Sequence, residues 1–123
     1  MKLTKTEEQL MQHLWELKTA FMKELVDAYA DPKPAPTTVA TLLKRMIDKG
    51  FVGFKVYGNS REYYPLVNKS DYFAKHVNEL VKNFFNDSAA QFASFFTKRS
   101  DFSADELEQL KDVIEQEIKR KKQ

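Results

Sequence analysis

The chain of 123 residues contains no cysteine. This absence excludes disulfide bonds, thiolate metal sites and cysteine nucleophiles together, and it suits a reducing cytoplasm. Three glycines in all argue against a glycine-rich phosphate-binding loop. The two histidines, His13 and His76, stand 63 positions apart in the sequence. We therefore expect no enzyme, no cofactor and no metal site.

Long hydrophobic runs are also missing. Every apolar run falls far short of the roughly 20 residues that a membrane-spanning helix needs. The first residues, MKLTKTEEQ, lack the apolar core of a signal peptide. Yet 42% of the residues are apolar, which is enough for a buried core in a chain of this length. We expect no membrane insertion and a cytoplasmic location.

The net charge of +2 is small, but the charges are unevenly distributed. The 29 residues from Lys33 to Arg61 hold six cations and one anion, whereas the residues from Asn68 onward hold ten of each. A local basic segment on a near-neutral chain is typical of a protein that binds nucleic acid with one part only. A solvated charged face is the alternative that composition alone leaves open.

The middle of this basic segment predicts a helix. Pro36 suits its first position, because a proline there loses no helical hydrogen bond. Gly50 follows the last apolar residue, where helices commonly end in a left-handed residue. The apolar residues between them recur with helical spacing and form one face. They are Val39, Leu42, Leu43, Met46 and Ile47.

A short hairpin is predicted directly after this helix. Two β-rich runs, Phe54–Tyr57 and Arg61–Tyr64, flank the turn signal Gly58-Asn59-Ser60. Tyrosines on such a hairpin can stack on bases or pack across the strands, and cross-strand packing is the interpretation we favour. A helix followed by a basic hairpin indicates a recognition helix and its wing.

The polar face of the predicted recognition helix carries hydroxyl groups and cations. Small side chains let a helix enter a groove of DNA, and cations meet phosphates or guanine edges. The candidate DNA contacts are Thr37, Thr38, Ala40, Thr41, Lys44 and Arg45 on the helix, and Lys55, Asn59 and Arg61 on the hairpin.

Two further helices are predicted ahead of the recognition helix. Thr4 and Glu7 have the spacing of a capping box, which indicates a helix start. Trp15 lies in the apolar stripe of that helix and is expected to pack in the core. A second amphipathic pattern runs from Phe21 to Tyr29, and the proline-rich stretch Asp31–Pro36 ends it.

The last third of the chain predicts three helices. The first runs from about Lys69 to Asn86, the second carries closely spaced phenylalanines, and Ser103 and Glu106 form the capping box of the third. Three short helices with so many aromatic residues would expose a large apolar patch on a monomer. We expect a second copy of the chain to cover it. The candidate dimer residues are Tyr72, Phe73, Val77, Leu80, Phe84, Phe92, Phe96, Leu107, Leu110 and Ile114.

Four stretches of the chain, at residues 3–17, 37–52, 61–73 and 101–114, follow one another in the order seen in a known family. They resemble the BlaI/MecI/CopY family of bacterial winged-helix repressors. The family's first helix is similar to LTKTEEQLMQHLWEL, and its recognition helix is similar to TTVATLLKRMIDKGFV. REYYPLVNKSDYF is similar to the wing strand and linker helix, and DFSADELEQLKDVI to the last helix. The resemblance implies a mainly α fold with a small β wing. It places a winged helix-turn-helix DNA-binding domain at residues 1–67 and a helical dimerisation tail at residues 68–123.

The resemblance also implies a function. The expected protein is a homodimer that binds double-stranded operator DNA and represses transcription. In the family, a membrane sensor-protease pathway releases some repressors by cutting an Asn-Phe bond in the dimerisation domain. That bond aligns with Phe95-Phe96, where Phe95 stands in place of asparagine. The C-terminal cysteines of metal-sensing members are absent here. The alternative is a winged helix used as a protein–protein interaction module.

Overall fold

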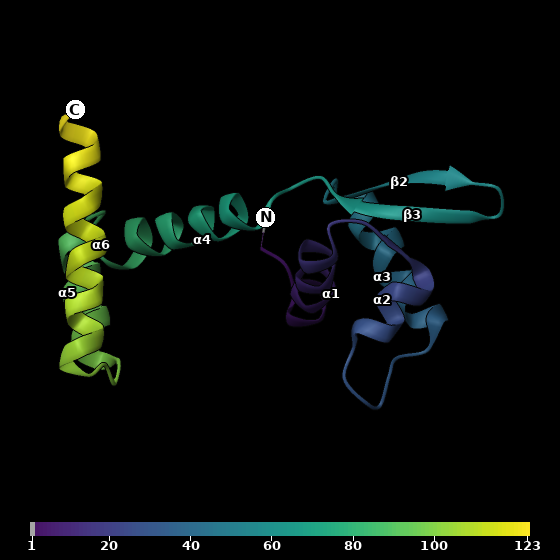
Figure 1. Ribbon diagram of the computed structural model, residues 1–123, viewed down its shortest axis with the longest axis horizontal. Coiled ribbons are helices and arrows are strands. Elements are labelled where there is room, and N and C mark those ends of the chain that lie inside the picture. Colours follow the sequence, from purple (N-terminus) through teal and green to yellow (C-terminus); the bar gives the residue numbers. More distant parts are fainter. Residues whose placement is uncertain (1) are drawn as a thin grey trace. The chain divides into compact units, whose positions relative to one another are not determined.

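The computed structural model describes residues 2–123, and within them it contains helices and one small antiparallel sheet (Figure 1). The elements in chain order are α1 Lys5–Leu17, β1 Ala20–Phe21, α2 Met22–Ala28, α3 Pro36–Asp48, β2 Val52–Tyr57, β3 Ser60–Pro65, α4 Lys69–Phe84, α5 Ala89–Arg99 and α6 Ala104–Lys122. The predicted fold class, mainly α with a small β wing, is confirmed.

The chain divides into two compact units, Met1–His76 and Val77–Gln123, called the head unit and the tail unit below. The division falls inside α4, so the first turns of that helix belong to the head unit. The sequence places the domain boundary between residues 67 and 68, just before α4 begins.

Local sequence explains where the helices of the head unit start and stop. The Thr4 hydroxyl accepts from the Glu7 amide, and the Glu7 carboxylate accepts from the Thr4 amide, which is the predicted capping box. Pro36 is the first residue of α3. After α3, Gly50 adopts a φ of +82°, a left-handed conformation that glycine takes without steric cost.

The sheet of the head unit has the strand order β1-β3-β2. The two residues of β1 pair with β3. The sequence did not predict β1, because a strand of two residues shows no periodicity. β2 and β3 form the wing, and their register pairs Tyr57 with Ser60. The hairpin loop is therefore Gly58-Asn59. The predicted turn of three residues is one residue too long, because Ser60 is the first residue of β3.

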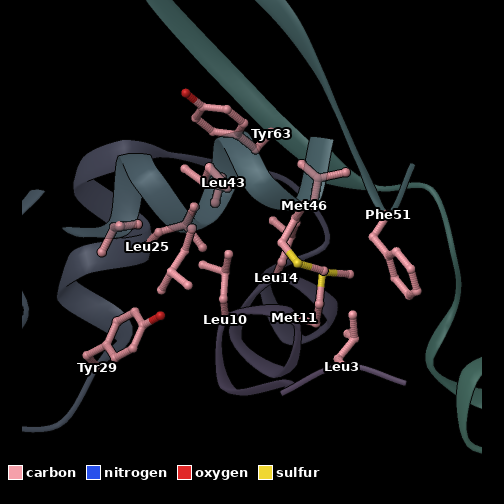
Figure 2. Close-up of a cluster of buried hydrophobic side chains, with 14 of the residues drawn as sticks. Leu3, Leu10, Met11, Leu14, Leu25, Tyr29, Leu43, Met46, Phe51 and Tyr63 are labelled. Atoms are coloured by element: carbon pink, nitrogen blue, oxygen red, sulfur yellow. The ribbon is translucent and has the colours of Figure 1, made fainter. Parts of the chain in front are cut away.

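The core of the head unit lies between its three helices and the base of the sheet (Figure 2). Leu10, Met11 and Leu14 of α1 meet Leu43 and Met46 of α3 there, all of them nearly inaccessible to solvent. The apolar stripe predicted for α3 is thus the face that packs inward. Its opposite face is left to solvent, and this decides which side of α3 can meet a ligand.

Two hydrogen-bonded aromatic residues attach the start of α4 and the residues just before it to α1 and the N-terminal segment. The Trp15 indole N–H donates to the Val67 carbonyl at 2.8 Å. The Tyr72 hydroxyl donates to Glu8 at 2.8 Å and accepts from the Leu3 amide at 2.9 Å. Burial and the nearby Glu8 carboxylate raise the pKa of Tyr72 to about 12, although the Leu3 bond lowers it.

Tyr72 therefore has a different place from the one the sequence indicates. Only 4% of its surface is exposed, and the core of the head unit surrounds it. A side chain buried within its own chain has no surface to offer a second copy. We leave Tyr72 out of the dimer surface proposed below.

The tail unit has almost no interior. Phe85, Phe92, Phe95, Phe96 and Phe102 form a chain of ring contacts with centroid separations of 5.2–5.8 Å. None of residues 77–123 is buried, and Phe84 is 76% exposed. Across residues 2–123, no helix is both long enough and apolar enough to cross a membrane.

Candidate nucleic-acid interface

The predicted contact residues all lie on the surface of the head unit. The six from α3 and the three from the wing are each exposed, whereas Val39, Leu42, Leu43 and Met46 on the inner face of α3 are buried. These six residues of α3 are three threonines, one alanine and two cations. The exposed Asp48, the last residue of α3, is the acidic residue of this helix, so small side chains and positive charge predominate on its exposed face.

The six cations between Lys33 and Arg61 fall into two groups. Lys33 donates from Nζ to the carbonyls of Asp27 and Tyr29 at 2.9 and 2.7 Å, so it caps the C-terminal end of α2. Lys49 donates to Glu7 at 2.7 Å. These two lysines support the fold. The remaining four are the cations among the predicted DNA contacts, Lys44, Arg45, Lys55 and Arg61.

Glu7 is a residue of α1 whose carboxylate faces the C-terminal end of α3, and none of its side-chain surface is exposed. Burial alone raises the pKa of this carboxyl, but the Lys49 ammonium and the hydrogen bonds from Thr4 outweigh it. The net result is a pKa below its ordinary value of 4.5, so the group stays ionised at neutral pH. Its charge also reaches Arg45, whose guanidinium lies 3.7 Å from Glu7 Oε2.

Arg61 lies where the wing meets α3. Its guanidinium carbon sits 4.3 Å from the centre of the Phe54 ring on the neighbouring strand, a cation–π contact that orients the charge. Arg61 also borders a hollow of about 350 Å³ between α3 and the wing. The residues that line it are Ala40, Leu43, Lys44, Ile47, Phe54, Arg61 and Tyr63. The fold thus brings Ala40 and Lys44 of α3 close to Arg61 of the wing.

A second hollow, of about 590 Å³, lies between α3 and the start of α1. Thr38, Thr41 and Arg45 line it together with Thr4 and Thr6. Thr4 and Thr6 are not among the predicted DNA contacts. Their capping-box spacing locates a helix start, but no periodicity indicates that this start lies beside α3.

Thr41 is partly committed within α3. Its hydroxyl donates to the Thr37 carbonyl one turn earlier at 3.0 Å. The bond directs the hydroxyl proton toward the helix and leaves the oxygen lone pairs and the methyl group for a ligand. Such a side chain is suited to apolar contact with a thymine methyl.

Lys55 and Asn59 extend the exposed surface along the wing. Lys55 faces solvent on β2 opposite Glu62, and Asn59 occupies the hairpin loop. Asn59 and Arg61 also border a hollow of about 620 Å³ against α2. Arg61 thus borders both α3 and α2, and Asn59 borders α2 and Pro36 at the start of α3. Within residues 2–123, the acidic and histidine side chains form no cluster that could hold a metal ion.

Comparison with protein families identifies the chain. The family model described as penicillinase repressor matches residues 3–116, which is most of the chain. The chain belongs to the penicillinase repressor family. This family is one of repressors and not of enzymes.

Individual relatives agree with this assignment over nearly their whole length. The methicillin resistance regulatory protein MecI of Staphylococcus aureus (strain N315) is 28% identical over 118 residues, covering 92% of this chain and 93% of that protein. The penicillinase repressor of Bacillus licheniformis is 23% identical, covering 99% of this chain and 96% of that protein. The matches therefore include both units.

A solved structure supports the fold of the head unit. The DNA-binding domain of the repressor BlaI, determined in solution, superimposes with a TM-score of 0.51 at 25% identity. The alignment covers 58% of this chain and 88% of that domain. The similar structure is thus a DNA-binding winged helix. The predicted resemblance of this chain to the BlaI/MecI family is confirmed.

Proposed function

We propose that this penicillinase repressor family member is a homodimeric, sequence-specific DNA-binding repressor of transcription. The observation that carries the proposal is the two-sided character of α3. Its apolar face is buried in the head core, and its exposed face carries threonines with Lys44 and Arg45, next to Arg61 of the wing. Such a face is suited to a DNA major groove.

Each group on this surface has a chemical role in the proposed complex. Thr37, Thr38, Ala40 and Thr41 allow α3 to approach the base edges, and their methyl groups suit thymine. Lys44 and Arg45 donate to guanine or phosphate oxygens. The wing residues, Lys55, Asn59 and Arg61, hold the sugar-phosphate backbone or the minor groove. Since operator DNA lies in the bacterial cytoplasm, this is where we place the protein.

The proposed dimer follows from the open apolar surface of the tail unit. Val77, Leu80 and Phe84 on α4 and Ile114 on α6 are each more than 40% exposed. A second copy of the chain would cover these surfaces and join two DNA-binding heads. Dimers of this kind bind two half-sites about one helical turn apart on a pseudo-palindromic operator. Occupying the operator would block transcription.

Selection from a pool of random DNA duplexes tests the proposal. We expect the intact chain to enrich one pseudo-palindromic sequence with a strong dependence on salt. Lys44→Ala and Arg45→Ala should each cost about 1–3 kcal/mol of specific binding if these side chains read bases. Lys55→Ala and Arg61→Ala should weaken binding to all sequences alike and lower the salt slope by about one unit each. Lys75→Ala, on the exposed surface of α4, is the matched control and should change neither.

The same selection separates this proposal from a protein–protein interaction module. A module of that kind would enrich no sequence, and the four alanine substitutions would leave binding to duplex DNA unchanged. Either result would exclude α3 and the wing as the DNA-reading surface.

For the release of repression we propose cleavage at Phe95-Phe96. Both side chains lie in the middle of α5 and are 51% and 41% exposed in the single chain. A protease needs an extended backbone, so α5 must open locally before the bond is cut. Cleavage would separate α6 from the rest of the chain and weaken the dimer. Two unlinked heads bind a double site far less tightly than a linked pair does.

Mapping of cleavage products tests this release step. The repressor is incubated with membranes from induced cells of its own source, which would supply a sensor-protease pathway, and the fragment ends are determined by mass spectrometry. We expect new ends at Phe95 and Phe96. Cuts confined to the loop before α3, or relief of repression without any cut, would contradict the proposal.

A further inference from the structure

Glu7 lies at the contact between α1 and α3 and faces two cations. Its Oε1 accepts from the Thr4 amide at 2.9 Å, and its Oε2 accepts from Lys49 Nζ at 2.7 Å. The Arg45 guanidinium approaches the same Oε2 to 3.7 Å. Lys49 is the first residue after α3 and lies one turn beyond Arg45, so a single buried carboxylate faces both cations.

The two cations are held differently. Lys49 makes a hydrogen bond, and 27% of its side chain is exposed. Arg45 is 49% exposed, and 3.7 Å is too long for a hydrogen bond. The guanidinium is therefore attracted toward Glu7 but retains its donors. It also borders the hollow that contains Thr38 and Thr41, two of the predicted DNA contacts.

We propose that Glu7 is a positioning residue for DNA reading, which holds Arg45 on the α1 side of α3 next to Thr38 and Thr41. The inference rests on the function proposed above. An arginine that is oriented before binding loses less conformational freedom in the specific complex. The negative charge of Glu7 also reduces the attraction of Arg45 to phosphates of any sequence. Both effects raise the preference for operator over other DNA.

Glu7→Gln is the direct test, because the amide keeps the shape of the side chain and an oxygen for the Thr4 amide. The measured quantity is the ratio of affinities for the selected duplex and a scrambled duplex. We expect affinity for the scrambled duplex to rise about threefold and the ratio to fall about fivefold or more, as one phosphate-attracting charge is released. In an Arg45→Ala background, Glu7→Gln should leave the ratio unchanged, since the two effects share one side chain.

Glu24→Gln is the matched control. Glu24 accepts from the Phe21 amide at 2.9 Å at the start of α2, as Glu7 does from Thr4 at the start of α1. Within residues 2–123 it makes no ion pair like that of Glu7 with Lys49. The affinity ratio should be unchanged in Glu24→Gln. An equal loss of affinity for both duplexes in Glu7→Gln, or the same fall in the ratio without Arg45, would overturn the positioning role.

A second measurement does not depend on DNA. Nuclear magnetic resonance of the Arg45 Nε–H group in the intact protein should show restricted side-chain motion that Glu7→Gln releases. Equal mobility in the two proteins would overturn the inference even if DNA binding differed. Conversely, failure of the intact chain to select any duplex would overturn the proposed function, while this resonance would still decide whether Glu7 orients Arg45.

The double variant Glu7→Gln/Lys49→Met covers the case in which Glu7→Gln does not fold. It removes both partners of the buried pair, and replacement of such a pair by neutral groups is often tolerated. The same fall in the affinity ratio and the same release of Arg45 are expected. A folded double variant with unchanged values for both would contradict the proposal.

Discussion

The head unit and the tail unit treat their apolar residues in opposite ways. Within residues 2–123, all 15 buried apolar residues lie between Leu3 and Tyr72, in the head unit. Of the 14 large apolar residues that are exposed in the same range, nine lie between Val77 and Ile118, in the tail unit. The head unit therefore has a core of its own, whereas the tail unit leaves its apolar surface exposed in the single chain, the surface that the proposed dimer would bury.

Two helices with similar sequence patterns illustrate this difference. Both α3 and α6 carry an apolar stripe and begin at a favourable start signal, Pro36 in one and Ser103 in the other. In α3 the stripe is covered by α1 and the sheet, as Leu43 at 1% exposure shows. In α6 the stripe is open, with Ile114 at 57%. An apolar stripe indicates that a helix needs a partner, but not which chain supplies it.

The largest effect should come from a charge placed in the tail surface. Ile114→Asp puts a carboxylate into the proposed dimer contact, where it would be desolvated. We expect sedimentation to show a single chain of 14.4 kDa instead of a dimer. Operator affinity should fall by about 10²–10⁴, because the second head loses its effective concentration.

Leu66→Asp is the control for this experiment. Leu66 of the head unit is 56% exposed, almost the same as Ile114, but lies outside the tail unit. We expect this variant to remain a dimer. If both variants dissociate, or if neither does, the exposed apolar surface of the tail unit is not the dimer contact.

A substitution in the head core should have the next largest effect. Leu43→Ala removes buried methyl groups from the core between α1 and α3, at a cost of about 2–5 kcal/mol in the free energy of unfolding. Chemical denaturation with urea measures it. Leu107→Ala, at 38% exposure in the tail unit, should instead show a loss that grows with protein concentration, since Leu107 makes its apolar contacts between two chains in the proposed dimer. Equal and concentration-independent losses would remove the distinction between the units.

Loss of the Tyr72 hydroxyl should have a smaller effect. Tyr72→Phe leaves the Leu3 amide and one Glu8 oxygen without a partner at the attachment of α4, which costs about 1–3 kcal/mol. The exposed Tyr57 on the wing provides the control, and Tyr57→Phe should be nearly neutral. If Tyr72→Phe dissociated the dimer without lowering the stability of the head unit, Tyr72 would belong to the dimer surface after all.

The smallest expected effect is a pH dependence of head stability that originates at Glu7. The pKa of Glu7 is lower in the folded head than its ordinary value of 4.5, so its ion pair stabilises the fold fully above that pH. The stabilisation should be lost as the pH falls below 4.5 toward the folded-state pKa. Unfolding experiments across this range should show a weaker pH dependence in Glu7→Gln. An unchanged pH dependence would mean that other carboxyl groups cause the acid effect.

Elements with a clear period or a clear end signal were predictable from the sequence. The capping boxes at Thr4 and Ser103, the left-handed Gly50 and the inner face of α3 are confirmed. Each depends on residues close together in the chain. Strand β1 was missed and the hairpin loop was one residue too long, because pairing with β3 decides both.

The features of the candidate site likewise divide into those that depend on neighbouring residues and those that depend on tertiary packing. The sequence alone determined the helical stripes, the basic segment from Lys33 to Arg61 and the apolar excess of the tail, because these depend on residue type and spacing. Only the tertiary structure decided that Lys49 supports the fold while Arg45 remains half exposed beside Glu7. The reason is physical: Glu7 and Lys49 are 42 residues apart, and only the packing of α1 against α3 brings their charges within hydrogen-bonding distance.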